Sequence, residues 1–512
     1  MLDTTRLAKN AQSMPPVFSH PEILRVMWGV MICIFLAALD QTAIIPALPA
    51  IASDLGTYTQ LSWVVAAYLI TSTISTPVYG KLSDIYGRRR LLAICLSVFI
   101  TASVLCGLAR SLDQLIWFRA IQGCGGGGLM ALTQAAIADV VSPRERGRYQ
   151  GYISAVWVLA SLSGPIVGGI IAQSLSWRWI FWVNLPIGLV AMWVCHRGLR
   201  GLSSPVLSSK PKLDIIGMLL LTGGLLLLLL GLGWGGKLYS WASYEIIGLM
   251  SLGSMFIFLL VFQEMRAHDP LFPPSIFRNS TYIANLIVST FTALLLFMCL
   301  FTIPLYFQLC RGMTAAQSGM YIAPFMIASA FGNVAGSRWG RYFGAMRACM
   351  RISTALSCLG LLLFALLSLD TPLWGVVAVL VMLGIGSGTS MICSITNSQN
   401  ALSPTNMGTG TSALLLLRSV GGAAGSTLAG AIIAAGLMSS RPGLDTSALT
   451  PEILLDHSAT LAGVSSMSEG LSSSFQMVFL AASALAAISF IVTLFMPNTP
   501  LRETVHAPAI YE

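Results

Sequence analysis

Long apolar runs recur along the chain, and this feature leaves few folds open to it. They begin near residues 27, 61, 91, 114, 149, 179, 213, 245, 282, 317, 350, 372, 408 and 472. A helix needs about 20 apolar residues to cross the hydrocarbon core of a bilayer, and no polar domain interrupts the series. We therefore expect an all-α integral membrane protein with 14 transmembrane helices, the first running from about Met27 to Ala50.

The composition agrees with this class. Hydrophobic residues make up 55% of the 512 residues and charged residues only 9%, whereas a soluble domain carries about 25% charged residues. The first residues are polar and contain no short apolar segment ahead of a cleavage site of small residues. We therefore expect no removed signal peptide.

The basic residues are distributed unevenly between the loops. Of the 28 lysines and arginines, five fall in the alternate loops that we expect outside the cell: Arg110, Arg178, Lys237, Arg311 and Arg441. Because basic residues concentrate on the cytoplasmic side of membrane proteins, both termini are expected in the cytoplasm. The net charge of +9 then reflects membrane orientation, and no nucleic-acid partner is expected.

The same topology places the glycosylation acceptor sequence at Asn279 in an inner loop. The glycosylation machinery cannot reach that side of the membrane, so Asn279 is expected to stay unmodified.

Part of the chain repeats itself. A shift of 261 residues superimposes one set of glycines on another, Gly123, Gly125 and Gly127 on Gly384, Gly386 and Gly388. Spans 4 and 5 thus recur as spans 12 and 13, which predicts two six-helix halves and a two-helix insert, as in secondary transporters with parallel repeats. The expected parts are a cytoplasmic tail (1–26), a first half (27–200), the insert (201–265), a second half (266–497) and a second cytoplasmic tail (498–512).

The inner loop between spans 2 and 3 has an unusual spacing, in which two glycines frame an acid ahead of basic residues: Gly80, Asp84, Gly87, Arg88 and Arg89. Glycine permits a tight turn, and Asp84 could brace against the arginines or against a helix N-terminus of the opposite half. This spacing predicts a latch that one conformation forms and another breaks. An ordinary positively charged inner loop would explain the arginines alone.

Asp40 and Arg119 are the ionisable residues best placed inside spans of the first half. A charge at bilayer depth is costly, so it usually faces a cavity or a partner. Asp40 in a partly dry cavity would hold a proton more tightly, and the approach of Arg119 would release that proton. The pair is therefore a candidate for proton coupling, and the alternative is a purely structural ion pair.

Span 5 contains a cluster of helix-bending and small residues, Gly164, Pro165, Gly168 and Gly169. Small residues let helices approach closely, and proline bends the backbone. The cluster predicts a hinge between the halves, and the alternative is plain helix packing.

Five stretches together resemble the major facilitator superfamily. Residues 80–90 match its loop signature, and residues 119–125 match its Arg-x-x-Gln-Gly-x-Gly pattern. Residues 39–49 and 177–188 are similar to motifs of its fourteen-span drug:proton antiporters, and residues 164–169 to the motif of its exporters. The resemblance implies the major facilitator fold and export of drugs or toxic secondary metabolites in exchange for protons. The matching loop of the second half, residues 336–344, lacks the acid, so no symmetric second latch is expected.

Aromatic residues and one further arginine are candidates for the substrate path. They lie where a cavity at the bilayer midplane could be: Phe35, Trp157, Phe301, Tyr306, Phe307, Tyr321, Phe325 and Arg418. A largely apolar cavity favours hydrophobic or weakly polar organic substrates. Arg418 either faces an anionic substrate or lies near the inner mouth, and the aromatic residues could equally face lipid.

An integral membrane enzyme is the remote alternative. The five histidines are isolated and lie outside the centres of the spans: His20, His196, His268, His457 and His506. The ten cysteines form no CxxC pair, so no metal site and no cofactor beyond the proton gradient are expected.

The function expected from the sequence is therefore proton-coupled efflux of small organic molecules by alternating access. The expected protein is a monomer surrounded by lipid in the plasma membrane, with the vacuolar membrane as an alternative. A fourteen-span proton-coupled importer, of the type that takes up siderophores, or a vacuolar carrier is the alternative function.

Overall fold

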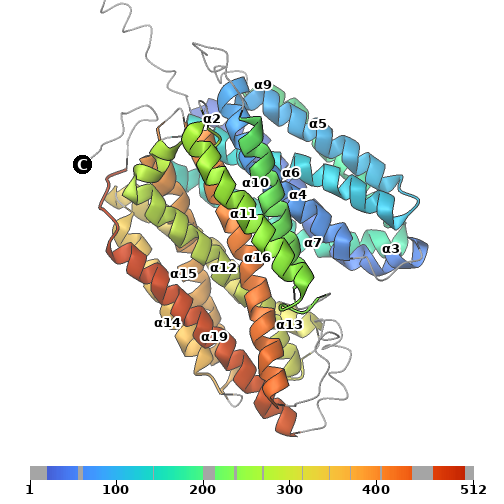
Figure 1. Cartoon of the computed structure of the whole chain (residues 1–512), viewed down its shortest axis with the longest axis vertical. Coiled ribbons are helices and arrows are strands. Elements are labelled where there is room, and N and C mark those ends of the chain that lie inside the picture. Colours follow the sequence, from blue (N-terminus) through green and yellow to red (C-terminus); the bar gives the residue numbers. More distant parts are fainter. Residues whose placement is uncertain are drawn as a thin grey trace, which may run out of the picture.

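The computed structural model describes residues 20–55, 62–141, 143–199, 214–235, 239–267, 270–313, 315–344, 346–368, 371–403, 406–440 and 465–501. In these ranges every regular element is a helix, apart from one isolated bridge between Gly235 and Tyr239. The long helices lie side by side in one bundle, with the early part of the chain on one side and the late part on the other (Figure 1).

The first group of helices precedes the insert. It consists of α2 (His20–Ala43), η1 (Ile45–Ala47), α3 (Leu48–Leu55), α4 (Ser62–Tyr86), α5 (Arg88–Gly107), α6 (Leu112–Val140), α7 (Pro143–Ser174), α8 (Trp179–Trp182) and α9 (Asn184–Gly198). The expected continuation of the first span to Ala50 is wrong, because α2 ends at Ala43 and the chain turns through η1. Pro46 and Pro49 lack the amide hydrogen that a continuing helix needs, which explains the early end.

The remaining helices form the insert and the last group. They are α10 (Ile215–Trp234), α11 (Tyr244–Arg266), η3 (Pro274–Arg278), α12 (Ser280–Leu309), α13 (Ala315–Phe343), α14 (Arg347–Ala365), α15 (Leu373–Ala401), α16 (Met407–Ser440) and α19 (Ser465–Leu494). Among the described residues, ten spans are long and apolar enough to cross a membrane, with α8 and α9 counted as one. The other four long helices, α4, α6, α7 and α13, are richer in glycine, hydroxyl and charged residues.

Corresponding glycines make the same kind of helix contact twice. A side chain added at Gly127 would overlap the carbonyl of Ser72, and one added at Gly388 would overlap the carbonyl of Ser329. α6 therefore lies directly against α4, and α15 against α13. The two largest buried clusters of the described residues lie one in each group, from Ile23 to Leu199 and from Leu295 to Ala486.

The helices α10 and α11 pack on each other, and α10 also contacts α4 and α16. They appear as the green pair between the two groups in Figure 1. Lys81 Nζ of α4 donates to the carbonyl of Pro270 (2.8 Å), and the backbone N of Phe272 donates to Glu264 Oε2 of α11 (2.9 Å). These contacts tie the segment after α11 to the end of α4, which contains Asp84 and was expected to be part of a loop.

Candidate functional site

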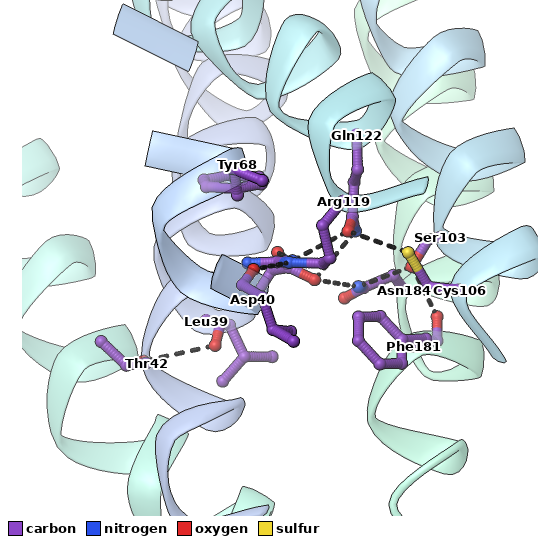
Figure 2. A network of polar contacts seen from close by, with 12 residues as sticks. Leu39, Asp40, Thr42, Tyr68, Ser103, Cys106, Arg119, Gln122, Phe181 and Asn184 are labelled. Atoms are coloured by element: carbon purple, nitrogen blue, oxygen red, sulfur yellow. Dashed lines mark hydrogen bonds and ion pairs between the residues drawn. The ribbon is translucent and has the colours of Figure 1, made fainter. Parts of the chain in front are cut away.

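Asp40 lies near the end of α2 and is shielded from solvent, with 1% of its surface exposed. Arg119 Nη1 of α6 lies 2.6 Å from Asp40 Oδ2. Gln122 Nε2 donates to Asp40 Oδ1 at 2.9 Å and Asn184 Nδ2 donates to the same oxygen at 2.7 Å (Figure 2). Both oxygens of the carboxylate therefore accept hydrogen bonds from neighbouring side chains.

Arg119 is itself held on several sides. Its Nη1 also donates to Gln122 Oε1 (2.8 Å) and its Nε donates to the carbonyl of Val64 (3.1 Å). The guanidinium lies over the ring of Tyr68, 4.3 Å from its centroid. Arg119 and Gln122 share one face of α6 because they are three residues apart, so the helix presents both to Asp40 together.

A fully buried ion pair has consequences for proton transfer. Taking two charges out of water is expensive, and removing one partner costs about 3–5 kcal/mol because the other charge is left unpaired. A proton cannot reach Asp40 in this arrangement unless a helix moves or water enters. Proton exchange at this pair would therefore require such a rearrangement.

Glycines of α7 lie directly against the end of α2, close to Asp40. A side chain added at Gly164 would overlap Thr42 Oγ1, and one added at Gly168 would overlap the carbonyl of Ala43, whereas Gly169 has 3.9 Å to its nearest neighbour, Pro46 Cβ. α7 therefore fits α2 only with small residues at two of the predicted hinge positions. The backbone of Pro165 continues α7, and its side chain lies outside the described part of the chain.

The carboxylate of Asp84 at the end of α4 reaches the first turn of α16. It accepts from the backbone N of Gly408 (3.1 Å) and of Thr409 (2.8 Å), and from Thr409 Oγ1 (2.9 Å). The first amide groups of a helix have no partner within it and carry partial positive charge, so a carboxylate is favourable there. Asp84 therefore contacts both kinds of partner expected for it, the N-terminus of a helix in the other group and an arginine, Arg88.

Arg88 connects Asp84 to a second acid. It lies 2.6 Å from Asp84 Oδ1 and 2.9 Å from Asp139 Oδ2 at the end of α6. Gly87, with φ of 87°, makes the turn between α4 and α5 in a conformation that favours glycine. Gly80 lies against Ser412 of α16 with no room for a side chain.

Arg89 is the one predicted latch residue directed elsewhere. Its Nη2 lies 2.8 Å from His196 Nε2 of α9. It therefore joins α5 to α9 within the first group of helices.

The predicted substrate-path residues do not gather at one place. Tyr306, Phe307 and Phe325 are buried in the core of the second group, where the Tyr306 ring packs on Phe364 and Phe475. Phe325 also lines a cavity of about 20 Å³ within that group, which has room for about one water molecule.

The other aromatic candidates are more accessible. Phe301 and Tyr321 are partly buried at the edge of the same core, Phe35 is partly buried beside Ala160, and Trp157 on α7 is 39% exposed.

Arg418 lies on α16, and Asn279 lies directly before α12, both in the second group of helices. Arg418 is partly buried on α16, and no hydrogen bond or ion pair to it is found among the described residues. Asn279 caps α12, because its Oδ1 accepts from the backbone N of Tyr282 (3.1 Å), and its Nδ2 donates to the carbonyl of Ala401 (3.3 Å). Within the described ranges no group of three or more metal-binding side chains is present.

The sequence profile of the Major Facilitator Superfamily matches residues 30–426. The chain belongs to this superfamily. The bundle described above is accordingly the major facilitator fold, and the protein is a multi-pass membrane transporter rather than an enzyme.

Several superfamily relatives named as transporters or as an efflux pump are similar over most of their length. The multidrug transporter protein MdtP of Bacillus subtilis is 34% identical, over 79% of this chain and 74% of its own. The acurin A biosynthesis cluster MFS-type transporter of Aspergillus aculeatus is 33% identical, over 80% of this chain and 74% of its own. The efflux pump FUS6 of Gibberella moniliformis is 32% identical, over 77% of this chain and 72% of its own. These names support transport of a drug or a metabolite by this chain.

Solved superfamily structures agree in fold. The human organic anion transporter MFSD10 gives a TM-score of 0.60 at 18% identity, covering 93% of this chain and 100% of its own. The proton:xylose symporter XylE gives a TM-score of 0.57 at 14% identity, covering 94% and 98%. At these identities the likeness concerns the fold alone.

Four polar residues of the site were not predicted from the sequence. Gln122, Asn184 and Ser103 complete the surroundings of Asp40, and Thr409 completes those of Asp84. Gln122 and Asn184 stood within the superfamily-like stretches 119–125 and 177–188, which was the one available signal. Ser103 and Thr409 carried none.

Proposed function

We propose that this transporter is a drug:proton antiporter of the fourteen-span type, which exports organic compounds from the cell as protons enter. The observation that carries the proposal is the ion pair of Asp40 and Arg119, a titratable group fully buried in the first group of spans. Protonation of Asp40 would release Arg119 and let the surrounding helices rearrange. We further propose that the protein acts as a monomer in the plasma membrane with both termini in the cytoplasm.

Alternating access requires that one end of the bundle closes while the other opens. We propose that Asp84 holds its end closed through α16, and that loss of this contact accompanies opening. The close fit of α7 on α2 at Gly164 and Gly168 supports a hinge near Asp40, since a small rotation of α2 there would move Asp40 relative to Arg119 on α6.

The proposal is tested with purified protein in proteoliposomes, with ethidium as the transported probe and the membrane potential clamped by potassium and valinomycin. An antiporter accumulates ethidium when the vesicle lumen is acidic, whereas a symporting importer does so when the outside is acidic. We expect accumulation in acid-loaded vesicles, collapse on addition of a protonophore, and no uphill accumulation by Asp40→Asn. Asp40→Glu should retain part of the activity with a shifted pH optimum, because it keeps the titrating group about one methylene away.

Asp113→Asn is the matched control for Asp40→Asn, because it neutralises an exposed carboxylate in the first turn of α6. It should transport like the wild type. Proton-driven accumulation by Asp40→Asn at the wild-type rate would show that the ion pair is structural and that protons couple elsewhere.

A further inference from the structure

We propose that Asn184 is a positioning residue that sets the affinity of Asp40 for a proton. The inference rests on the proposed proton coupling and extends it, by naming the side chain that tunes the coupling group and the helix that carries it.

The amide group of Asn184 is held in a single orientation. Its Nδ2 lies 2.7 Å from Asp40 Oδ1 and 2.9 Å from Ser103 Oγ (Figure 2). Ser103 donates its one hydroxyl hydrogen to the carbonyl of Phe181 (2.8 Å), so it can only accept from Asn184. A flipped amide would direct its oxygen at a carboxylate, and therefore both neighbours require the nitrogen on this side.

A hydrogen bond donated to a carboxylate favours the ionised form over the protonated one. Asp40 receives such bonds from two different helices. Arg119 and Gln122 are both on α6, whereas Asn184 is the first residue of α9. A displacement of α9 from α2 would therefore remove one donor and raise the proton affinity of Asp40 while the ion pair with α6 stayed intact.

The segment that leads into Asn184, residues 177–183, is anchored at one end of the bundle. Arg178 Nη1 lies 2.5 Å from Asp54 Oδ2 on α3, and its Nη2 donates to the carbonyl of Ala109 (3.1 Å). Trp177 Nε1 donates to the same Asp54 oxygen (3.1 Å). The hydrogen bond from Arg178 lowers the pKa of Asp54, which stays charged at neutral pH. A positioning group needs such support, because small shifts weaken a hydrogen bond.

The titratable groups that face Asp40 among the described residues come from three helices. They are Arg119 on α6, Tyr68 on α4, whose ring lies under the guanidinium, and Cys106 on α5, 3.7 Å from Gln122 Oε1. From α7, the described contacts with the end of α2 involve glycines and Ala160, none of which titrates. Asn184 is therefore the contribution of α9, and it is uncharged at every pH.

The test measures protonation of Asp40 directly. Infrared difference spectra of the purified protein are recorded during a pH titration, and the carboxylic acid band of Asp40 is assigned by its loss in Asp40→Asn. Asn184→Leu keeps the branched shape of the side chain, at a somewhat larger volume, and removes the donor. We expect its titration midpoint about one pH unit above that of the wild type, a tenfold higher proton affinity, because one hydrogen bond to a charged group is lost.

Two further variants keep the test decisive. Ser103→Ala removes the acceptor that orients the amide and should shift the midpoint the same way by less, even where Asn184→Leu does not fold. Asn285→Leu is the matched control, since Asn285 on α12 is equally buried but donates to the backbone carbonyl of Thr281 (2.6 Å). It should titrate like the wild type.

Three results would overturn the assignment. They are an unchanged midpoint in the Asn184 and Ser103 variants, a shift of the same size in Asn285→Leu, and an Asp40 that stays ionised in every variant. The titration involves no transport, so uphill transport by Asp40→Asn would refute the proposed coupling while leaving this measurement to decide the role of Asn184.

Discussion

Without Arg119, Asp40 would be left as a buried negative charge with no opposite charge beside it, held only by the amides of Gln122 and Asn184. Arg119→Met should therefore lower the free energy of unfolding by about 3–5 kcal/mol, unless Asp40 takes up a proton and reduces the loss. The double variant Asp40→Leu/Arg119→Met removes both charges and should regain most of that stability, because a well-packed apolar pair can replace a buried ion pair. Neither variant should transport uphill.

Denaturant or thermal unfolding in detergent measures the stability of the two variants, and ethidium accumulation measures their uphill transport. A double variant that is less stable than Arg119→Met alone would contradict this account of the ion pair. Uphill transport by the double variant would place proton coupling at another group.

The residues of the site differ in how far the sequence could predict them. Asp40, Arg119 and Asp84 stand out because charged residues are rare in or beside apolar runs. Asn184 and Ser103 do not, since neutral polar residues are common in such spans and their pairing depends on how α5 and α9 pack against α2. The partners of Asp84 include two backbone amides, which no side-chain pattern can reveal.

At the level of helices, two neighbouring glycines of α7 offer a matched comparison. A methyl group at Gly168 would overlap the backbone carbonyl of Ala43, which cannot rotate away, whereas the nearest neighbour at Gly169 is 3.9 Å distant. Gly168→Ala should therefore force α7 away from α2, at a cost of about 1–3 kcal/mol in stability, and slow transport. Gly169→Ala should be neutral or slightly stabilising, because alanine is the better helix former.

Thermal unfolding and ethidium accumulation of the two variants, measured side by side, check this expectation. Equal behaviour of Gly168→Ala and Gly169→Ala would mean that α7 and α2 do not need their close contact.

The proposal that the contact between Asp84 of α4 and the start of α16 keeps this end of the bundle closed can be tested separately. Asp84→Asn weakens the charge-assisted bonds to Gly408 and Thr409, worth about 1–3 kcal/mol. The ratio of closed to open molecules at this end should fall about tenfold. Electron paramagnetic resonance distances between spin labels at Tyr86 and Tyr342, exposed residues at the ends of α4 and α13, measure that ratio in a cysteine-depleted background.

Arg90→Gln serves as the control, since Arg90 is an exposed cation close to Asp84 in the chain. Its distance distribution should match that of the wild type. The latch hypothesis fails if Asp84→Asn also leaves the distribution unchanged.

Most helix starts follow from hydropathy alone, because a span of fixed length is required by the bilayer. The helices that begin within about three residues of the expected positions are α4, α5, α6, α8, α10, α11, α12, α13, α14, α15 and α16. In contrast, α2 begins at His20, α7 at Pro143 and α19 at Ser465, ahead of the apolar runs. The break between α2 and α3 was missed because Ile45, Ala47 and Leu48 keep that segment apolar. Hydropathy does not register the prolines that end the helix.

At the scale of the whole molecule, the glycine repeat predicted two similar groups of helices, and the close contacts at Gly127 and Gly388 are made in the same way in both. How the groups face each other could not be predicted, since it depends on contacts between distant helices such as those of Asp84 with α16. The boundaries of the halves and of the insert stay predictions.

The orientation of the bundle in the membrane is the remaining prediction at this scale. The distribution of basic residues predicts that the end that holds Asp84 and Asn279 lies in the cytoplasm, and Asn279 is also engaged as the cap of α12. The acceptor sequence at Asn279 should therefore carry no glycan when the protein is expressed in a eukaryotic cell. As a positive control, Ser458→Asn creates an Asn-Ala-Thr acceptor in the segment 441–464, which the charge distribution places outside. A shift in electrophoretic mobility that is reversed by a glycosidase should appear with Ser458→Asn and be absent from the wild type. The reverse pattern would invert the topology and move the proposed Asp84 latch to the outer face.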